Sequence, residues 1–117
     1  MINKKVLKQQ YKESLPSMGI YCIKNITTGK VFIGKSSDLR GKLNSIKFQL
    51  NNGSFINGEL QKDYNNSGEN DFSFEVIDTL ETKEDPAYDY SRDLRILEQM
   101  WFEKLQPYDD AGYHKRK

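Results

Sequence analysis

The sequence predicts an α/β domain of the α+β kind, with a small three-stranded antiparallel sheet flanked by helices. Two observations predict this class. Short β-rich runs occur at residues 19–25, 31–34 and 71–78, and the first two lie close enough to form a hairpin. Segments with the apolar spacing of helices lie between and after these runs. With 117 residues, the chain is expected to form one domain.

Residues 1–17 are predicted to form a basic arm or short helix. Leu7, Tyr11 and Leu15 recur at helical intervals, and Pro16 ends the pattern. From residue 18 the pattern changes to that of strands, and the two runs joined by a Gly- and Thr-containing loop predict a β-hairpin. We therefore assign residues 18–114 to a single domain and residues 115–117 to a basic tail.

Two helices are predicted after the hairpin. Apolar residues recur with the spacing of one helical face over residues 38–52, and Gly53 is placed to cap the C-terminal end. A shorter helix is predicted to begin with Asn57 as its N-cap and to run to Gly68. Both helices follow the hairpin directly, so they are expected to cover the sheet.

The last strand and the last helix flank an acidic loop. Residues 71–78 alternate apolar and polar side chains and give the clearest strand pattern of the chain. Residues 82–90 are too polar to be buried. Ser91 is placed to cap a helix over residues 92–105, which Pro107 ends.

The net charge of +1 conceals two halves of opposite sign. Residues 1–62 carry a charge of +8, residues 63–113 carry −10, and the last residues are basic again. A basic half can bind phosphate, whereas an acidic half repels it unless its carboxylates hold a metal ion or face away. The alternative is that the two halves neutralise each other in the fold.

The sequence also indicates where in the cell the protein is expected. The sequence contains no apolar run long enough for a signal-peptide core or a membrane span, so we expect a soluble cytoplasmic protein with no membrane partner. The single cysteine, Cys22, has no second cysteine to pair with and lies in an apolar run. We expect it to be a small buried core residue.

One carboxylate is out of place on the last predicted helix. On a helical wheel of about 100° per residue, an apolar arc is formed by Leu97, Trp101, Leu94, Leu105 and Phe102. Glu98 falls inside this arc, between Leu105 and Phe102. A charged group that faces a core costs several kcal/mol unless a cation or hydrogen-bond donors meet it. Two explanations remain open. Glu98 pairs with Arg95 or with a lysine of another element, or it binds one Mg²⁺ (or Mn²⁺) ion in a cleft.

The chain resembles the GIY-YIG nuclease superfamily. The letters GIY at residues 19–21, FIG at 32–34, SSDL at 36–39 and EQMW at 98–101 occur in the order of the family's motifs. The resemblance spans residues 18–114. It implies a compact domain that cleaves DNA phosphodiesters with the help of one divalent ion.

The resemblance implies roles for four residues, which we predict as the catalytic positions. Tyr21 stands at the first motif tyrosine, and Glu98 stands at the metal ligand. Phe32 stands where the family has its second tyrosine, so it keeps the ring and lacks the hydroxyl. Lys42 stands at a helix arginine and offers a point charge in place of a bidentate fork.

Two further family positions also differ. The helix histidine of the family falls on Ile46, which lies in an apolar stripe and is more simply a core residue. The family's Gly-Tyr-Asn element reads Gly112-Tyr113-His114, so the only histidine replaces an asparagine beside the site. Because loss of a general acid or base removes about 10²–10⁴-fold in rate, these changes favour an impaired or redirected active site.

Three functions remain open from the sequence. The first is a metal-dependent DNA endonuclease, and the second is a catalytically inactive module that binds nucleic acid. The third is a protein-interaction module on the same fold, whose acidic residues 78–93 contact a basic protein partner. The predicted contacts to DNA, assisted by the N-terminal lysines, are Lys24, Lys30, Lys35, Arg40 and Lys47.

Overall fold

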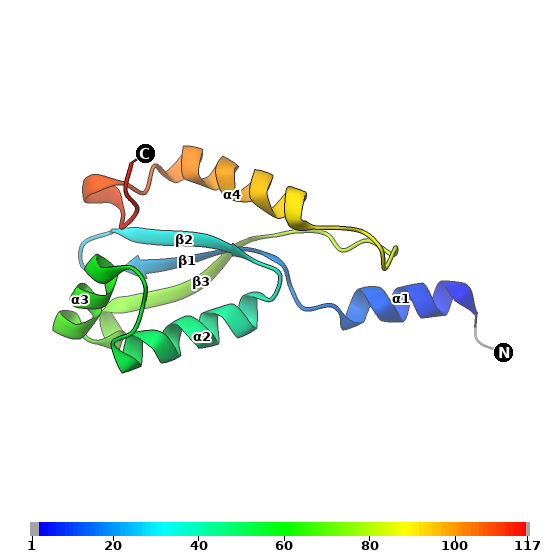
Figure 1. Ribbon diagram of the computed structural model, residues 1–117, viewed down its shortest axis with the longest axis horizontal. Coiled ribbons are helices and arrows are strands. Elements are labelled where there is room, and N and C mark those ends of the chain that lie inside the picture. The colour runs from blue at the N-terminus through cyan, green and yellow to red at the C-terminus, as the bar shows by residue number, and fades with distance from the viewer. Residues whose placement is uncertain (1–2, 117) are drawn as a thin grey trace.

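The central element of the fold is a three-stranded antiparallel sheet with the strand order β2-β1-β3 (Figure 1). Its strands are β1 (Gly19–Asn25), β2 (Val31–Ser36) and β3 (Phe72–Thr79). The computed structural model describes residues 3–116. The predicted class, a small antiparallel sheet flanked by helices, is confirmed.

Helices lie on both sides of the sheet. α2 (Leu39–Asn52) and α3 (Gly58–Ser67) lie on one side, and α4 (Ser91–Leu105) lies on the other (Figure 1). Short 3-10 turns occupy Glu69–Asp71 and Asp109–Ala111. α1 (Lys4–Ser14) projects beyond the end of the sheet and gives the molecule its longest dimension of 59 Å (Figure 1).

The residues predicted to cap α2 and α3 do so. The Asp38 carboxylate accepts the N–H of Gly41, and Gly53 ends α2 in the left-handed conformation at φ 74°. The Asn57 side chain caps α3 in the same way as Asp38 caps α2. The predicted cap of α4 is wrong: Ser91 is the first helical residue, and its N–H and hydroxyl both donate to the carboxylate of Asp89.

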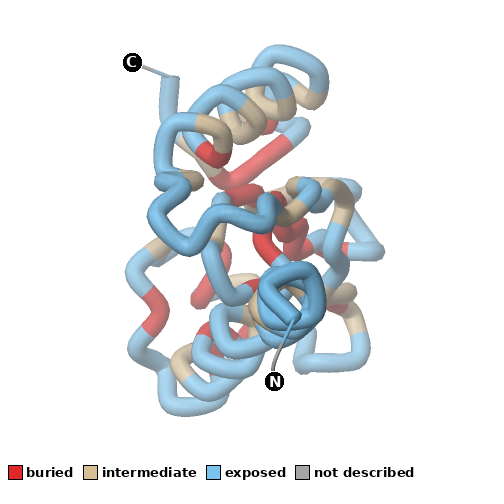
Figure 2. The backbone as a smooth tube through the Cα atoms, turned by 90° about the vertical axis from the view of Figure 1, so that its right-hand side faces the viewer, coloured by how far each residue is buried: buried red, intermediate tan, exposed pale blue. Residues whose placement is uncertain are grey.

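The sheet separates two apolar clusters. Because side chains alternate along a strand, Tyr21 and Ile23 of β1 face α2 and α3, whereas Ile20 and Cys22 face α4. Figure 2 shows that the buried backbone is concentrated in the central strands, between layers of exposed helix. Cys22 is a buried free thiol, as predicted, and burial raises its pKa to about 11. Ile46, on the face of α2 that packs on the sheet, is fully buried, which confirms it as a core residue.

The C-terminal segment covers the free edge of β2. Gly112 forms a parallel bridge with Val31, and the Tyr113 N–H donates to the Val31 carbonyl at 3.0 Å. The buried Tyr113 ring anchors this segment, because its hydroxyl donates to Asp63 at 2.8 Å and accepts from Asn25 at 3.0 Å. The next residue is thereby held beside β2.

The acidic residues 78–93 run from the end of β3 across a loop into the first turn of α4. Most of their side chains are exposed. A protein partner for this segment stays a prediction. No helix within the described residues is long and apolar enough to cross a membrane.

Candidate active site

Tyr21 lies at the centre of the candidate site. It belongs to the middle strand, is 5% exposed, and is the register partner of Gly34 across the hairpin. A Cβ atom at Gly34 would lie 2.3 Å from the Tyr21 hydroxyl oxygen, so the ring packs directly on the glycine backbone. Burial, and then the charge of Glu98, raise the pKa of Tyr21 to about 12. Glu98 binds the backbone of Lys35, the residue after Gly34, so its carboxylate lies on the same part of β2 as the phenol.

Glu98 reaches from α4 to the free edge of β2. Its Oε2 accepts the backbone N–H of Lys35 at 3.1 Å, and its Oε1 lies 3.5 Å from the Lys35 ammonium. The side chain remains 25% exposed. One of the two explanations for this carboxylate is thus confirmed, since Glu98 pairs with a lysine of another element. Its role as a metal ligand stays a prediction.

The donor set around Glu98 limits what a metal site could be. Among residues 3–116, no group of three or more His, Cys, Asp or Glu side chains is arranged to hold a metal ion. Glu98 offers hard, partly exposed carboxylate oxygens. These oxygens fit Mg²⁺, which often takes only one or two protein carboxylates and completes its shell with water and phosphate.

His114 lies beside this site and is held by the same strand. Its Nε2 accepts the N–H of Ile33 at 3.0 Å, so the neutral ring carries its proton on Nδ1. The ring stacks on Phe32 with centroids 4.5 Å apart and meets the Phe102 ring edge-on at 4.6 Å. Burial lowers the pKa of His114. The imidazole is therefore neutral at pH 7.

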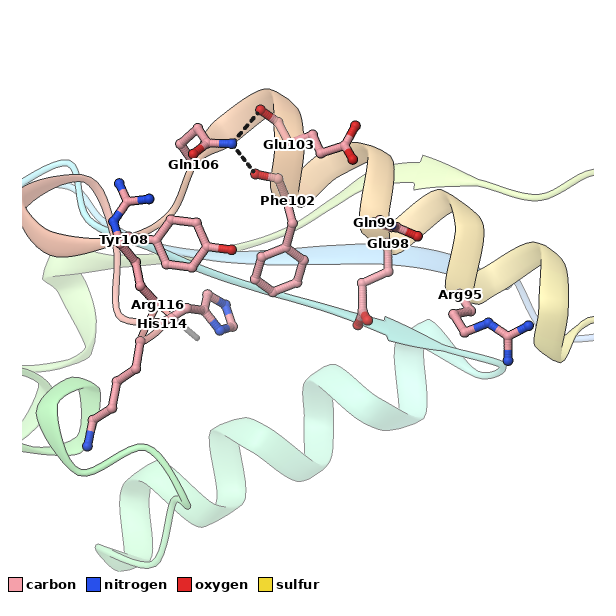
Figure 3. A pocket seen from close by; sticks show the side chains of 10 residues that line it. Arg95, Glu98, Gln99, Phe102, Glu103, Gln106, Tyr108, His114 and Arg116 are labelled. Atoms are coloured by element: carbon pink, nitrogen blue, oxygen red, sulfur yellow. Dashed lines mark hydrogen bonds between the residues drawn. The ribbon is translucent and has the colours of Figure 1, made fainter.

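A hollow of about 700 Å³ opens between α4 and the C-terminal segment. Figure 3 shows the Glu98 side chain directed from α4 toward the sheet, with Phe102 and His114 on the same wall and Arg95 at one end. Sequence reasoning placed His114 beside the site and gave it no role. The signal for such a role was available, because His114 is the only histidine of the chain.

Phe32 belongs to an aromatic cluster, in keeping with its lack of a hydroxyl. Besides stacking on His114, its ring meets Phe55 edge-on at 5.3 Å and lies 6.4 Å from the Tyr21 ring. These contacts place an apolar surface where the resemblance implies a second hydroxyl. Phe32 therefore packs among aromatic rings beside the site and offers it no polar group.

Two of the predicted lysines, Lys35 and Lys42, lie close to the end of β2. Lys35 leaves the end of β2 and contacts Glu98, whereas Lys42 is exposed on the first turns of α2. Both line a second hollow of about 560 Å³, together with Met18 and Ser36. Lys35 therefore lies between the two hollows. The structure brings together Tyr21, Phe32, Lys35 and Glu98, and places Lys42 in the adjoining hollow.

The other predicted DNA contacts are spread over the molecule. Lys30 lies at the hairpin turn and forms an ion pair with Glu59 at 2.6 Å. Lys47 lies 5.0 Å above the Phe74 ring, on the side of α2. Lys24 is exposed on β1, and Arg40 is exposed on α2. Their contacts to DNA stay predictions, and the structure does not gather them on one surface.

Two solved structures are similar to this one. The first, the catalytic domain of the homing endonuclease I-TevI, matches with a TM-score of 0.69 and 22% identity, over 86% of this chain and 99% of that chain. The chain has the GIY-YIG fold. The second, a variant of the intron endonuclease I-TevI catalytic domain with one glutamate replaced by alanine, matches with a TM-score of 0.63 and 23% identity, over 77% and 84% of the two chains.

These two structural matches are the evidence for the GIY-YIG fold. No family model matches the chain, and no curated protein sequence matches it significantly. Two of the motif residues lie at neighbouring positions along β2. Gly34 accommodates the Tyr21 ring, and Glu98 faces the same part of β2 from the opposite layer.

Proposed function

We propose that the chain hydrolyses DNA phosphodiester bonds with the help of one divalent ion. The observation that carries this proposal is the position of three groups at the end of β2, in a domain with the GIY-YIG fold: the Tyr21 hydroxyl packs on Gly34, and Glu98 binds the next residue, Lys35. A phenol, a cation and a hard carboxylate are the groups that acid–base and metal-assisted hydrolysis of a phosphodiester requires.

Each residue has a defined part in this proposal. The ionised Tyr21 oxygen accepts a proton from the attacking water and becomes a neutral phenol, and Lys35 and Lys42 provide positive charge for the phosphate. Glu98 would hold the Mg²⁺ or Mn²⁺ ion, which would supply Lewis-acid stabilisation of the charge that develops on phosphate. His114, held beside β2 by its hydrogen bond from Ile33, would offer its Nδ1–H as a further hydrogen-bond donor.

The pKa of Tyr21 sets the expected rate. With a pKa of about 12, only about one Tyr21 in 10⁵ is ionised at pH 7. The negative charge of Glu98 contributes to this high value, so neutralising that charge favours the phenolate. We therefore expect slow cleavage that accelerates with rising pH.

A second candidate, nucleic-acid binding without cleavage, is favoured by one specific observation. Two positions at which the resemblance implies polar groups, Phe32 and Ile46, belong to the apolar cluster under α2. Losing a general acid or base costs about 10²–10⁴-fold in rate, so the remaining groups could be too few for turnover.

Plasmid nicking distinguishes the two candidates. The purified chain, Glu98→Ala and the control Glu84→Ala are incubated with supercoiled plasmid in Mg²⁺, in Mn²⁺ and in EDTA. Glu84 is exposed in the acidic loop, so its replacement removes the same charge away from the site. If the chain hydrolyses DNA, the wild type and Glu84→Ala should nick the plasmid in the presence of metal. Glu98→Ala should not.

A gain-of-function variant sharpens this test. Phe32→Tyr restores the second hydroxyl and should raise the nicking rate if Tyr21 and Glu98 form a working site. Binding of plasmid without nicking by the wild type and by Phe32→Tyr would reject hydrolysis and leave the second candidate. Equal nicking by the wild type and Glu98→Ala would reject the assigned site.

A further inference from the structure

α1 carries a continuous face of lysines. At about 100° per residue, Lys4, Lys8, Lys12 and Lys5 fall within an arc of about 100° on the helix surface. The single acid of the helix, Glu13, lies outside this arc and accepts a hydrogen bond from the Gln9 amide at 2.9 Å. One side of α1 is therefore purely cationic.

This arrangement does not serve the stability of the helix. Lys4 and Lys5 lie in the first turn, where positive charge opposes the helix dipole, and lysines four residues apart repel each other. None of the α1 lysines forms an ion pair with any described residue. Charges that weaken a helix and have no partner within residues 3–116 are available to an external one.

The helix also lacks support from the rest of the fold. None of its 11 residues is buried, as the exposed helix in the foreground of Figure 2 shows. A helix shorter than about 12–15 residues is marginal in water without packing. A ligand that neutralises the lysines would therefore stabilise α1 as it binds.

α1 is attached beside the candidate active site. The Ser17 carbonyl accepts the N–H of Leu39 at 3.0 Å, which fixes the end of the α1 linker to the start of α2. The next residue, Met18, is buried and lines the hollow that also contains Lys35 and Lys42. A polyanion bound at these two lysines can therefore continue toward α1.

We propose that α1 is a DNA-binding arm whose lysine face binds the phosphates of a duplex that flanks the active site. This inference rests on the proposed function for the choice of DNA as the polyanion. Successive lysines at four-residue intervals repeat about every 6 Å along the helix, which suits a row of charges better than a single anion. The contacts are to the backbone and carry no sequence preference.

The test is equilibrium binding in EDTA, where no metal-dependent cleavage occurs. Fluorescence anisotropy of a labelled 20-base-pair duplex is measured against salt for the wild type, for Lys4→Gln/Lys8→Gln/Lys12→Gln, and for the control Lys62→Gln/Lys83→Gln/Lys104→Gln. Both triple variants remove three positive charges, and the control lysines are exposed on other elements. Neither set removes a buried side chain, so both variants should fold.

Binding through α1 predicts a specific change in salt dependence. The logarithm of the binding constant falls with the logarithm of the salt concentration, and each lost phosphate contact makes this slope shallower by about 0.9. The slope of the α1 variant should therefore be shallower by about 2–3, and its affinity should be at least about 10-fold lower. The control should keep the wild-type slope. Circular dichroism should show that DNA increases the helix content of the wild type more than that of the α1 variant.

Other outcomes would reject the proposal that α1 is a DNA-binding arm. Equal slopes for the α1 variant and the control would reject it, and so would a wild type that binds no duplex at low salt. If the α1 variant instead abolishes self-association in sedimentation and leaves DNA binding intact, the lysine face contacts the acidic residues 78–93 of a second copy. Failure of nicking with intact α1-dependent binding rejects hydrolysis alone, so the two proposals fail separately.

Discussion

Replacing Gly34 with alanine tests the contact on which the site depends. A Cβ atom at this position would lie 2.3 Å from the Tyr21 hydroxyl oxygen, 2.6 Å from Cζ and 2.9 Å from Cε2. Ordinary van der Waals contact begins near 3.4 Å, so the ring would have to withdraw by roughly 1 Å. Tyr21 is buried against Phe32 and the α2 cluster, which leaves the ring little room.

The expected cost is that of overpacking a core. Inserting a methyl group into a well-packed site costs about 1–3 kcal/mol, which lowers the urea midpoint by roughly 0.5–1.5 M for a chain of this size. Gly58→Ala is the matched control. No heavy atom lies within 4 Å of a Cβ at Gly58, which begins α3, so this change should stabilise the protein by up to about 1 kcal/mol.

A double-mutant cycle isolates the contact. In a Tyr21→Leu background the Gly34→Ala change no longer meets the ring, so its cost should shrink, with a coupling energy of about 1–3 kcal/mol. Urea unfolding followed by circular dichroism gives all four free energies. An unchanged midpoint for Gly34→Ala, or no coupling to Tyr21, would show that the ring does not lie on the glycine.

Three further predictions concern titration and a buried network. Because the pKa of Tyr21 is raised to about 12 by burial and by the charge of Glu98, the free energy of unfolding should hold up to about pH 10 and fall from there to pH 12. Glu98→Gln should lower the pKa of Tyr21 in ultraviolet difference spectra, and an unchanged titration would contradict the proximity of the two groups. Burial lowers the pKa of His114, so stability should be full above about pH 6.5 and decline at lower pH as the unfolded state takes up the proton first. His114→Asn, whose amide oxygen can accept the same strand N–H, should flatten this decline in urea titrations. Asn25→Ala leaves the Tyr113 hydroxyl without its buried donor and should cost about 1–3 kcal/mol in thermal unfolding, whereas a change below 0.5 kcal/mol would show that the network is dispensable.

Local sequence patterns predicted the elements of the fold well. Strand alternation, helical spacing and the caps at Asp38, Gly53 and Asn57 act over a few residues, so the sequence shows them directly. The cap at Ser91 was predicted wrongly because Asp89, two residues earlier, competes for its hydroxyl and its N–H. The misplaced carboxylate at Glu98 was visible because a helical wheel exposes it.

The partners of the site residues were harder to predict. Lys35 contacts Glu98 across 63 residues of sequence, and His114 contacts Ile33 across 81. No local pattern specifies such contacts, because they depend on which layers the sheet brings together. Sequence reasoning therefore identified Glu98 and predicted Lys35 as a contact to DNA, and it did not specify which lysine pairs with Glu98. The ion pair between Lys30, a predicted contact to DNA, and Glu59 of α3 was likewise not predicted.

The covered edge of β2 has a consequence for the synthesis of the protein. The edge of β2 is covered by two hydrogen bonds, from the Ile33 N–H to His114 and from the Tyr113 N–H to the Val31 carbonyl. His114 and Tyr113 are translated about 80 residues after β2. At ~5–20 residues per second, a ribosome needs roughly 4–16 s to add them. During that interval the nascent hairpin presents an unpaired strand, a form prone to join other chains. Chaperone protection of the emerging N-terminal half would matter most in those seconds.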